Sequence, residues 1–117
     1  MSCNRDPYVP DYKNVKGFVI AKETCNTEVS QDYWLIDLTY WPDTPQYGDT
    51  ITINNTTFRN VVKVKGLDQR LKQIGMAVSV DFKTVTSNKV ETTGCSVQNP
   101  VTFRLKELFI INQGEIR

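Results

Sequence analysis

The sequence has no histidine and little of the other chemistry that catalysis and metal binding most often use. Histidine is the commonest side chain for general base catalysis and for metal ligation. The three cysteines, Cys3, Cys25 and Cys95, form no CxxC pair of the kind that binds zinc or carries out redox chemistry. We therefore predict a protein that is not an enzyme, with no catalytic residue, no metal and no cofactor.

Long apolar runs and an excess of one charge are also absent. The longest purely apolar runs have four residues, as in "FVIA" and "LFII", which is far too short to span a bilayer. Lys and Arg number 14 against 13 Asp and Glu, so the net charge of +1 creates no overall field for nucleic acid or an anionic membrane. Any such binding would have to come from a local patch.

What is present suits one soluble domain. The chain has 117 residues, of which 39% are hydrophobic, and this is enough for a single core. Residues 1–12 contain Pro7 and Pro10 and no periodic pattern, so we expect an extended leader there. Residues 13–117 then form the domain, which we expect to be monomeric.

Hydrophobicity with a period of two residues dominates the domain and predicts β-strands. In "MAVSVDF", residues 76–82, every second side chain is apolar and large, and "YWLIDLTY", residues 33–40, behaves likewise with Trp34 in the core. The pair Asn54 and Asn55 favours a turn, giving either a hairpin or one long bent strand. The remaining predicted strands are 15–21, 50–53, 57–65 and 103–112, and the predicted long connections are 41–50 and 86–100.

One segment has a helical period instead. In "GLDQRLKQIG", residues 66–75, Leu67, Leu71 and Ile74 recur at helical spacing and Gly75 ends the pattern, so we predict a short amphipathic helix. Three strands, a helix and two strands is the order of an OB-fold. The predicted fold class is therefore all-β with one short helix, a five-stranded OB-like Greek-key barrel. A β-sandwich is the alternative, but it leaves the helix unexplained.

The cysteines bear on the compartment. Cys25 and Cys95 lie in polar connections, either as two free thiols or as a disulfide, and a disulfide requires an oxidising compartment. Their loop setting argues against burial and favours the disulfide. Cys3 follows a small residue and precedes the proline-containing leader, so it is either an incidental thiol or a lipid attachment site like that of a bacterial lipoprotein.

Four segments, "VKGFVIAKETC", "LKQIGMAVSVDFK", "TTGC" and "LKELFIINQ", cover roughly residues 15 to 113 and carry a resemblance. Together they resemble the small OB-like domains of bacterial envelope lipoproteins, most of which have no characterised function. The resemblance lies in pattern rather than in a diagnostic motif. It implies an exported barrel with Cys25 and Cys95 paired, and the long "WPDTPQYGDT" connection departs from it.

Two surfaces are candidates for ligand binding. Arg59, Lys63 and Lys65 share one parity of their strand, so we expect all three to face outward, with Tyr33 as a stacking platform nearby. Trp41 and Tyr47 lie in a connection that contains two prolines. They either remain exposed and bind a glycan, a peptide or a protein, or fold back as a lid over the core.

The carboxylates add little to this picture. Glu107 is the one acid in an unusual position, within the apolar last strand, where it is either buried with a raised pKa or turned outward by a bulge. The sequence therefore predicts a non-enzymatic, exported interaction or small binding module. We expect it to be lipid-anchored, periplasmic or attached to the outer membrane, with an unknown protein or glycan partner and with membrane contact only through the anchor. The alternative is a cytosolic protein that binds single-stranded nucleic acid, which the charge balance disfavours.

Overall fold

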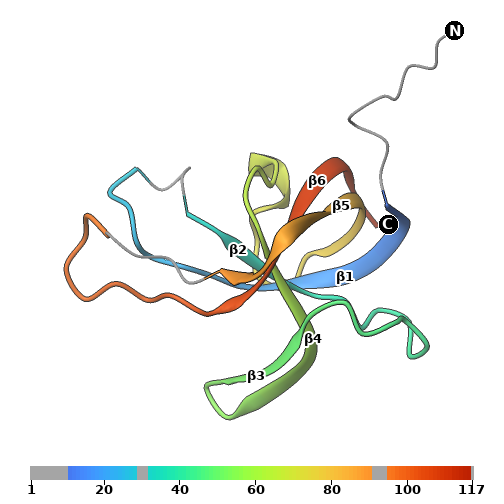
Figure 1. Cartoon of the computed structure of the whole chain (residues 1–117), viewed down its shortest axis with the longest axis horizontal. Coiled ribbons are helices and arrows are strands. Elements are labelled where there is room, and N and C mark those ends of the chain that lie inside the picture. The colour runs from blue at the N-terminus through green and yellow to red at the C-terminus, as the bar shows by residue number, and fades with distance from the viewer. Residues whose placement is uncertain (1–10, 29–31, 91–94, 117) are drawn as a thin grey trace, which may run out of the picture.

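The segments with a period of two form the strands of one sheet. The computed structural model describes residues 11–28, 32–90 and 95–116. The described residues form six strands and one turn of 3-10 helix, and Figure 1 shows how the strands are arranged. Their bounds are β1 (Tyr12–Lys22), β2 (Trp34–Asp37), β3 (Asp49–Ile53), β4 (Thr56–Val64), η2 (Gln69–Leu71), β5 (Ala77–Val90) and β6 (Leu105–Glu115).

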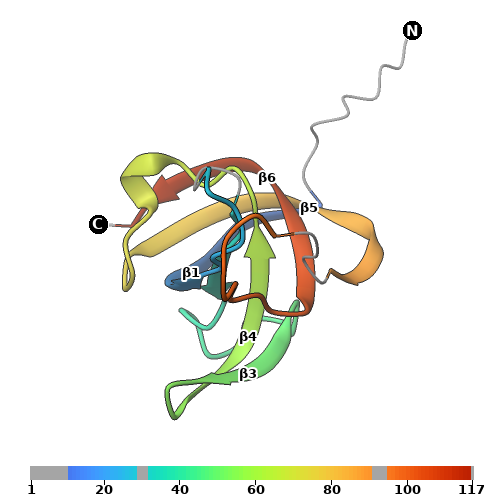
Figure 2. The same cartoon turned by 90° about the vertical axis from the view of Figure 1, so that its left-hand side faces the viewer.

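The strand order is β2-β1-β5-β6-β4-β3, and β2 also pairs with β4. Five of the six strands, all but β3, therefore form a closed ring of pairings. All the pairs are antiparallel except β4 with β6, which is parallel and aligns Lys63 with Glu107. The strands β5 and β6 curve strongly in Figure 2, as closure of the ring requires.

The strand β4 pairs with three other strands along its length. Its C-terminal half pairs with β2 and β6, and its N-terminal half forms a hairpin with β3 that projects from the rest of the sheet in Figure 1. Asn54 and Asn55 have φ angles of 51° and 67°, the left-handed conformation that a tight hairpin turn requires. Of the two structures that the sequence allowed here, the hairpin is the one that forms.

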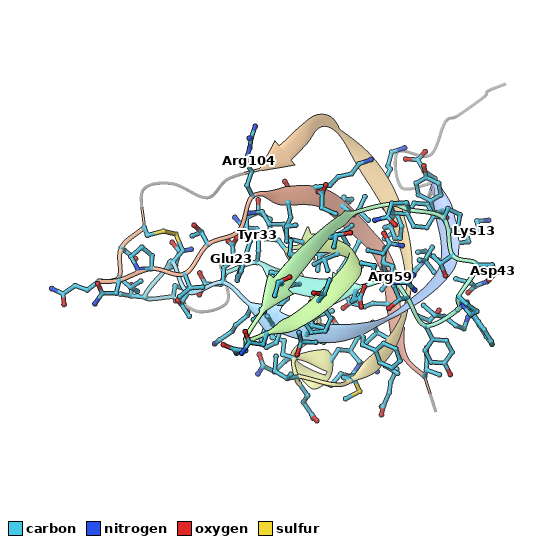
Figure 3. All side chains as sticks on the ribbon, turned by 90° about the horizontal axis from the view of Figure 1, so that it is seen from below. Lys13, Glu23, Tyr33, Asp43, Arg59 and Arg104 are labelled. Carbon is cyan, nitrogen blue, oxygen red and sulfur yellow. A yellow bond between two sulfur atoms is a disulfide. The ribbon has the colours of Figure 1, made fainter. Side chains whose placement is uncertain are left out.

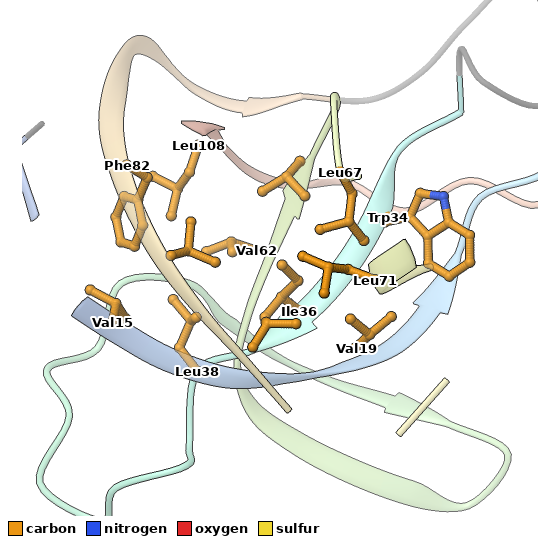
Figure 4. Packing of buried hydrophobic residues seen from close by; sticks show 13 residues of the cluster. Val15, Val19, Trp34, Ile36, Leu38, Val62, Leu67, Leu71, Phe82 and Leu108 are labelled. Atoms are coloured by element: carbon orange, nitrogen blue, oxygen red, sulfur yellow. The ribbon is translucent and has the colours of Figure 1, made fainter. Parts of the chain in front are cut away.

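The principal hydrophobic core lies inside the ring (Figure 4). Alternate residues of β5, namely Val78, Val80 and Phe82, are buried there, which confirms the period-two prediction for this strand. Trp34 is buried in the same cluster, as predicted. The other buried members of the cluster are Val15, Val19, Ile36, Leu38, Val62, Val64, Leu67, Leu71 and Leu108.

A second, smaller cluster covers the opposite face of β2 and β4. Leu35, Val61 and Leu105 are fully buried there, and Phe103 packs against them. Because each face of β2 is covered by one of the two clusters, all four of its residues are buried. This second cluster decides which side chains on β4 reach solvent.

The predicted helix at 66–75 is wrong. Only η2 forms there, with a backbone bond from Leu71 N–H to Asp68 O at 2.9 Å. Gly66 and Gly75 adopt left-handed φ angles of 83° and 92°, so the chain turns sharply at both ends of the segment. Leu67 and Leu71 reach the core while Ile74 is 63% exposed. Two anchors in so short a connection do not offset the cost of starting a helix.

Two boundaries also differ from the prediction. The connection predicted from residue 86 begins later, because β5 continues to Val90. The sheet begins before residue 13, because β1 starts at Tyr12 and Asp11 N–H donates to Phe82 O at 3.0 Å. The rest of the predicted leader, residues 1–10, lies outside the described residues and includes Cys3. Among the described residues, no helix has the length and apolar character needed to cross a membrane.

Candidate functional site

The connection between β2 and β3, residues 38–48, is held in a defined shape by a buried amide. We call it the aromatic loop. The Asn60 side chain on β4 is only 2% exposed. Its Oδ1 accepts the backbone N–H groups of Tyr47 and Gly48 at 2.9 and 2.8 Å, and its Nδ2 donates to the carbonyls of Leu38 and Pro45 at 3.2 and 2.8 Å. One side chain thus satisfies four backbone groups of the aromatic loop.

Further contacts fix the shape of the aromatic loop. A Cβ at Gly48 would lie 2.1 Å from the carbonyl oxygen of Val61, so glycine is required where the loop meets β4. The amide of Gln46 donates to the carbonyls of Gly48 and Arg59. Two prolines, Pro42 and Pro45, reduce the freedom of the chain further. The aromatic loop is therefore a preformed surface.

The two aromatic residues predicted to bind ligand have different surroundings. Trp41 is 52% exposed and meets Tyr40 edge-on, with ring centroids 5.1 Å apart. Tyr47 packs on Tyr12 and Phe82, with ring centroids 4.6 and 5.6 Å apart. Burial, with a smaller effect of Tyr12, raises the pKa of Tyr47. Tyr47 is therefore the lid on the core, and Trp41 is the exposed surface.

A shallow cavity of about 260 Å³ lies beside Trp41. Its polar walls come from both the aromatic loop and the start of β1. Asn14 has a φ of 55° and marks an irregularity in the pairing of β1, where its N–H bonds Asp81 Oδ1 at 2.8 Å. Such bulges redirect neighbouring side chains. The residues that line the cavity include Lys13, Asn14, Lys16, Trp41, Asp43 and Thr44.

An apolar hollow of about 300 Å³ lies further along β1. Phe18 lines this hollow and packs on Tyr40, with ring centroids 5.5 Å apart. Tyr40 in turn packs on Trp41, so a row of aromatic rings leads from the hollow toward the polar cavity. Asp37 also lines the hollow, but its carboxylate already accepts hydrogen bonds from Thr39 Oγ1 and Asn60 N–H.

The prediction that Arg59, Lys63 and Lys65 all face outward is wrong for one of them. Arg59 and Lys65 are exposed, but Lys63 is 0% exposed. Its ammonium group lies 2.8 Å from Glu23 Oε2, which is equally buried, and donates to Phe103 O at 2.6 Å. The parity of the strand placed Lys63 on the correct face, but the second hydrophobic cluster and Phe103 cover that face.

Tyr33, predicted as a stacking platform near the basic residues, lies beside Lys63 and Lys65. The ammonium groups of Lys63 and Lys65 lie 4.7 and 4.8 Å from the centre of its ring. Burial, together with the charge of Glu107 and a hydrogen bond to it, raises the pKa of Tyr33 to about 12. Figure 3 shows Tyr33 and Glu23 toward the disulfide, with Lys13 and Asp43 at the other end and Arg59 between. Two cations already use the Tyr33 ring.

The disulfide between Cys25 and Cys95 is confirmed, with a Cα–Cα distance of 4.6 Å. The expectation that both cysteines avoid burial is wrong for Cys25, which is 2% exposed. Asp32 explains its position, because Oδ1 of this buried carboxylate accepts the N–H groups of Cys25 and Asn26 at 3.0 and 2.9 Å. Cys25 therefore sits in an ordered turn rather than a free polar connection.

Comparison of the chain with known protein-family models, with curated proteins and with solved structures finds no match. Its function must therefore be argued from its own residues. Asn60 and Glu23, the two side chains that organise the two ends of the sheet, are not among the residues predicted from the sequence. A signal exists for each in retrospect. Asn60 interrupts an apolar strand, and Glu23 follows directly on β1.

Proposed function

We propose that this chain is a non-enzymatic binding module built on an OB-like barrel. The ring of pairings through β1, β2, β4, β6 and β5 and the parallel β4–β6 pair support this assignment. In a five-stranded Greek-key barrel the last strand closes the ring in this way. The connection that carries η2 takes the place of the helix, and β3 is an addition to the basic arrangement.

The disulfide supports an exported location. Disulfides persist in oxidising compartments and are rare in the cytosol. Cys25 and Cys95 are bonded and hold together two connections separated by 70 residues. We place the protein in the periplasm or on the outer membrane of a bacterial envelope, as a monomer anchored by a lipid on Cys3.

The observation that carries the binding function is the exposed indole of Trp41 on a preformed loop beside a polar cavity. Ligand sites typically combine a rigid aromatic surface with a few placed polar groups. The cavity presents ammonium, amide, carboxylate and hydroxyl groups together, from Lys13, Asn14, Asp43 and Thr44. This mixture of donors and acceptors suits a ligand rich in hydroxyl groups, with an apolar ring face for the indole. We propose that the site binds a glycan by one sugar unit, and the alternative ligand is a protein partner.

An array of envelope glycans, followed by calorimetry on any ligand found, tests this proposal. Trp41→Ala should abolish binding while leaving the melting temperature within a few degrees of wild type. Phe109→Ala is the matched control, because Phe109 is an aromatic residue of similar exposure, 49%, on β6 away from the cavity. If both variants bind as well as wild type, the site lies elsewhere.

The nucleic-acid alternative makes a different prediction. Arg59 on β4 and Lys65 just beyond β4 are exposed, but the Tyr33 ring is already in contact with Lys63 and Lys65. Stacking of a base would have to displace both cations. We expect no binding of a single-stranded oligonucleotide at physiological salt. Tight binding that weakens steeply with added salt would favour the alternative instead.

A further inference from the structure

The segment from Cys95 to Phe103, which we call the strap, is fastened to the end of β1 at several points. Cys95 is bonded to Cys25, and the N–H groups of Ser96 and Val97 donate to Cys25 O at 2.8 and 3.3 Å. Further along, Val101 and Thr24 exchange two backbone hydrogen bonds, both of 2.9 Å. The strap thus follows the chain from Cys25 back toward Glu23.

The far end of the strap completes the buried ion pair. Phe103 N–H donates to Glu23 Oε2 at 2.8 Å, and Phe103 O accepts from Lys63 Nζ at 2.6 Å. A buried ion pair is tolerated only when hydrogen bonds satisfy its remaining polar atoms. One residue of the strap supplies a donor to the acid and an acceptor to the base, so the environment of both charges depends on where the strap lies.

The middle of the strap is open to solvent, although Thr27 N–H also donates to Ser96 Oγ at 3.0 Å and Phe103 packs on the second hydrophobic cluster at the far end. Its central residues, Ser96 and 98–101, are exposed, and Val101 is 48% exposed. A segment with little apolar burial opens at a much lower free energy than the core. The core strands are closed by their own pairings, and the cluster that contains Val78 and Val80 lies inside the ring.

From this arrangement we propose that the disulfide is a redox-controlled latch: its reduction releases the strap and exposes Lys63 and Glu23 to solvent while the rest of the sheet stays folded. The reductant is a dithiol. It supplies two electrons and two protons, so that the bond between the two sulfur atoms breaks, two thiols form and the dithiol closes to its own disulfide.

The geometry also indicates which sulfur is attacked. Cys25 is buried and its backbone is held by Asp32, whereas Cys95 is partly exposed on the strap. A dithiol therefore reaches Cys95, the mixed disulfide forms there, and Cys25 leaves as the thiolate and takes up a proton. The β1 side stays in place while the strap moves. This inference is independent of the glycan site, which lies at the opposite end of the molecule in Figure 3.

The test compares labelling of lysine amines by mass spectrometry in the oxidised protein and after treatment with dithiothreitol. Lys65 is the internal control, because it lies just beyond β4 and is exposed in the oxidised protein. In the oxidised protein we expect Lys63 to react at least tenfold more slowly than Lys65. In the reduced protein the two rates should come within about threefold, with the amides of Val78 and Val80 still protected from hydrogen exchange.

Two results would overturn the proposal. Lys63 could stay as protected after reduction as before, which would show that the strap holds without the disulfide. The amides of β5 could instead lose protection together with Lys63, which would show that the disulfide holds the whole fold. Val101→Pro provides a second check in the oxidised state, because it removes the N–H that bonds Thr24 O. Labelling of Lys63 should then rise several-fold with the disulfide intact, and no rise would count against the latch.

Discussion

Each end of the sheet holds a long connection in a fixed shape, but the two ends do so by different chemistry. At one end the neutral side chain of Asn60 holds the aromatic loop through four hydrogen bonds and leaves Trp41 exposed. At the other end a disulfide and the Lys63–Glu23 ion pair hold the strap and bury two charges. The difference teaches that a long connection can be rigid either to present a side chain or to cover one.

The largest loss of stability should come from breaking the ion pair between Lys63 and Glu23. Lys63→Ala leaves the carboxylate of Glu23 buried without its ammonium partner, and we expect a loss of about 3–5 kcal/mol in the free energy of unfolding. Chemical denaturation measures it. The double variant Glu23→Gln with Lys63→Met keeps an acceptor for Phe103 N–H and should recover more than half of the loss. Equal losses in the single and double variants would mean that the charge itself is not what matters.

The matching change at the other end is Asn60→Ala. It removes hydrogen bonds from four backbone groups, some of which regain water as the aromatic loop loosens, so we expect a loss of about 2–3 kcal/mol. Thr52→Ala is the control, because Thr52 is exposed on β3 and should change stability by no more than about 0.5 kcal/mol. Binding at the Trp41 cavity should weaken in the first variant alone. A stable Asn60→Ala protein with full binding would contradict the role of Asn60 in holding the aromatic loop.

Alkaline pH should lower the stability of the protein through Tyr33, which lies at the end of the sheet with the buried ion pair. Tyr33 has a pKa of about 12 in the folded protein against about 10 when unfolded, so the folded state keeps its proton longer. The stabilisation from Tyr33 is therefore present below pH 10 and is lost as the pH rises from about 10 to 12. Titration of phenolate absorbance should show one tyrosine near pH 12 that is missing in Tyr33→Phe. Glu107→Gln should lower that pKa, and an unchanged value would exclude Glu107 as a cause.

The smallest change in stability should follow from Trp41→Ala. Its indole is half exposed and makes one edge-on contact with Tyr40, so the loss should be about 0.5–1 kcal/mol. Tyr47→Ala, in the same loop, should cost at least about 2 kcal/mol because Tyr47 packs on Tyr12 and Phe82. Thermal unfolding of the two variants separates the exposed aromatic from the lid. Similar losses would mean that Trp41 also closes the core.

Several parts of this structure could be predicted because their signals are local. The alternation in 76–82 identified the buried face of β5, and the pair Asn54 and Asn55 marked the turn between β3 and β4. The same local reasoning failed at 66–75, where the helical spacing of Leu67, Leu71 and Ile74 is real but the chain forms only η2. A pattern shows which side chains can share a face, whereas the positions of β4 and β5 decide how the chain between them runs.

By itself the sequence determined the β character of the chain and the approximate positions of its strands, because alternation depends on residues that are close together in the sequence. It also offered Cys95 as a partner for Cys25, because both cysteines lie in polar connections. Only the tertiary structure decided that Lys63 is buried while Lys65 is exposed, that Tyr47 covers the core while Trp41 does not, and that Asn60 holds the aromatic loop. The physical reason is the same in each case. The face of a strand follows from its own residues, but what covers that face comes from segments far away in the sequence.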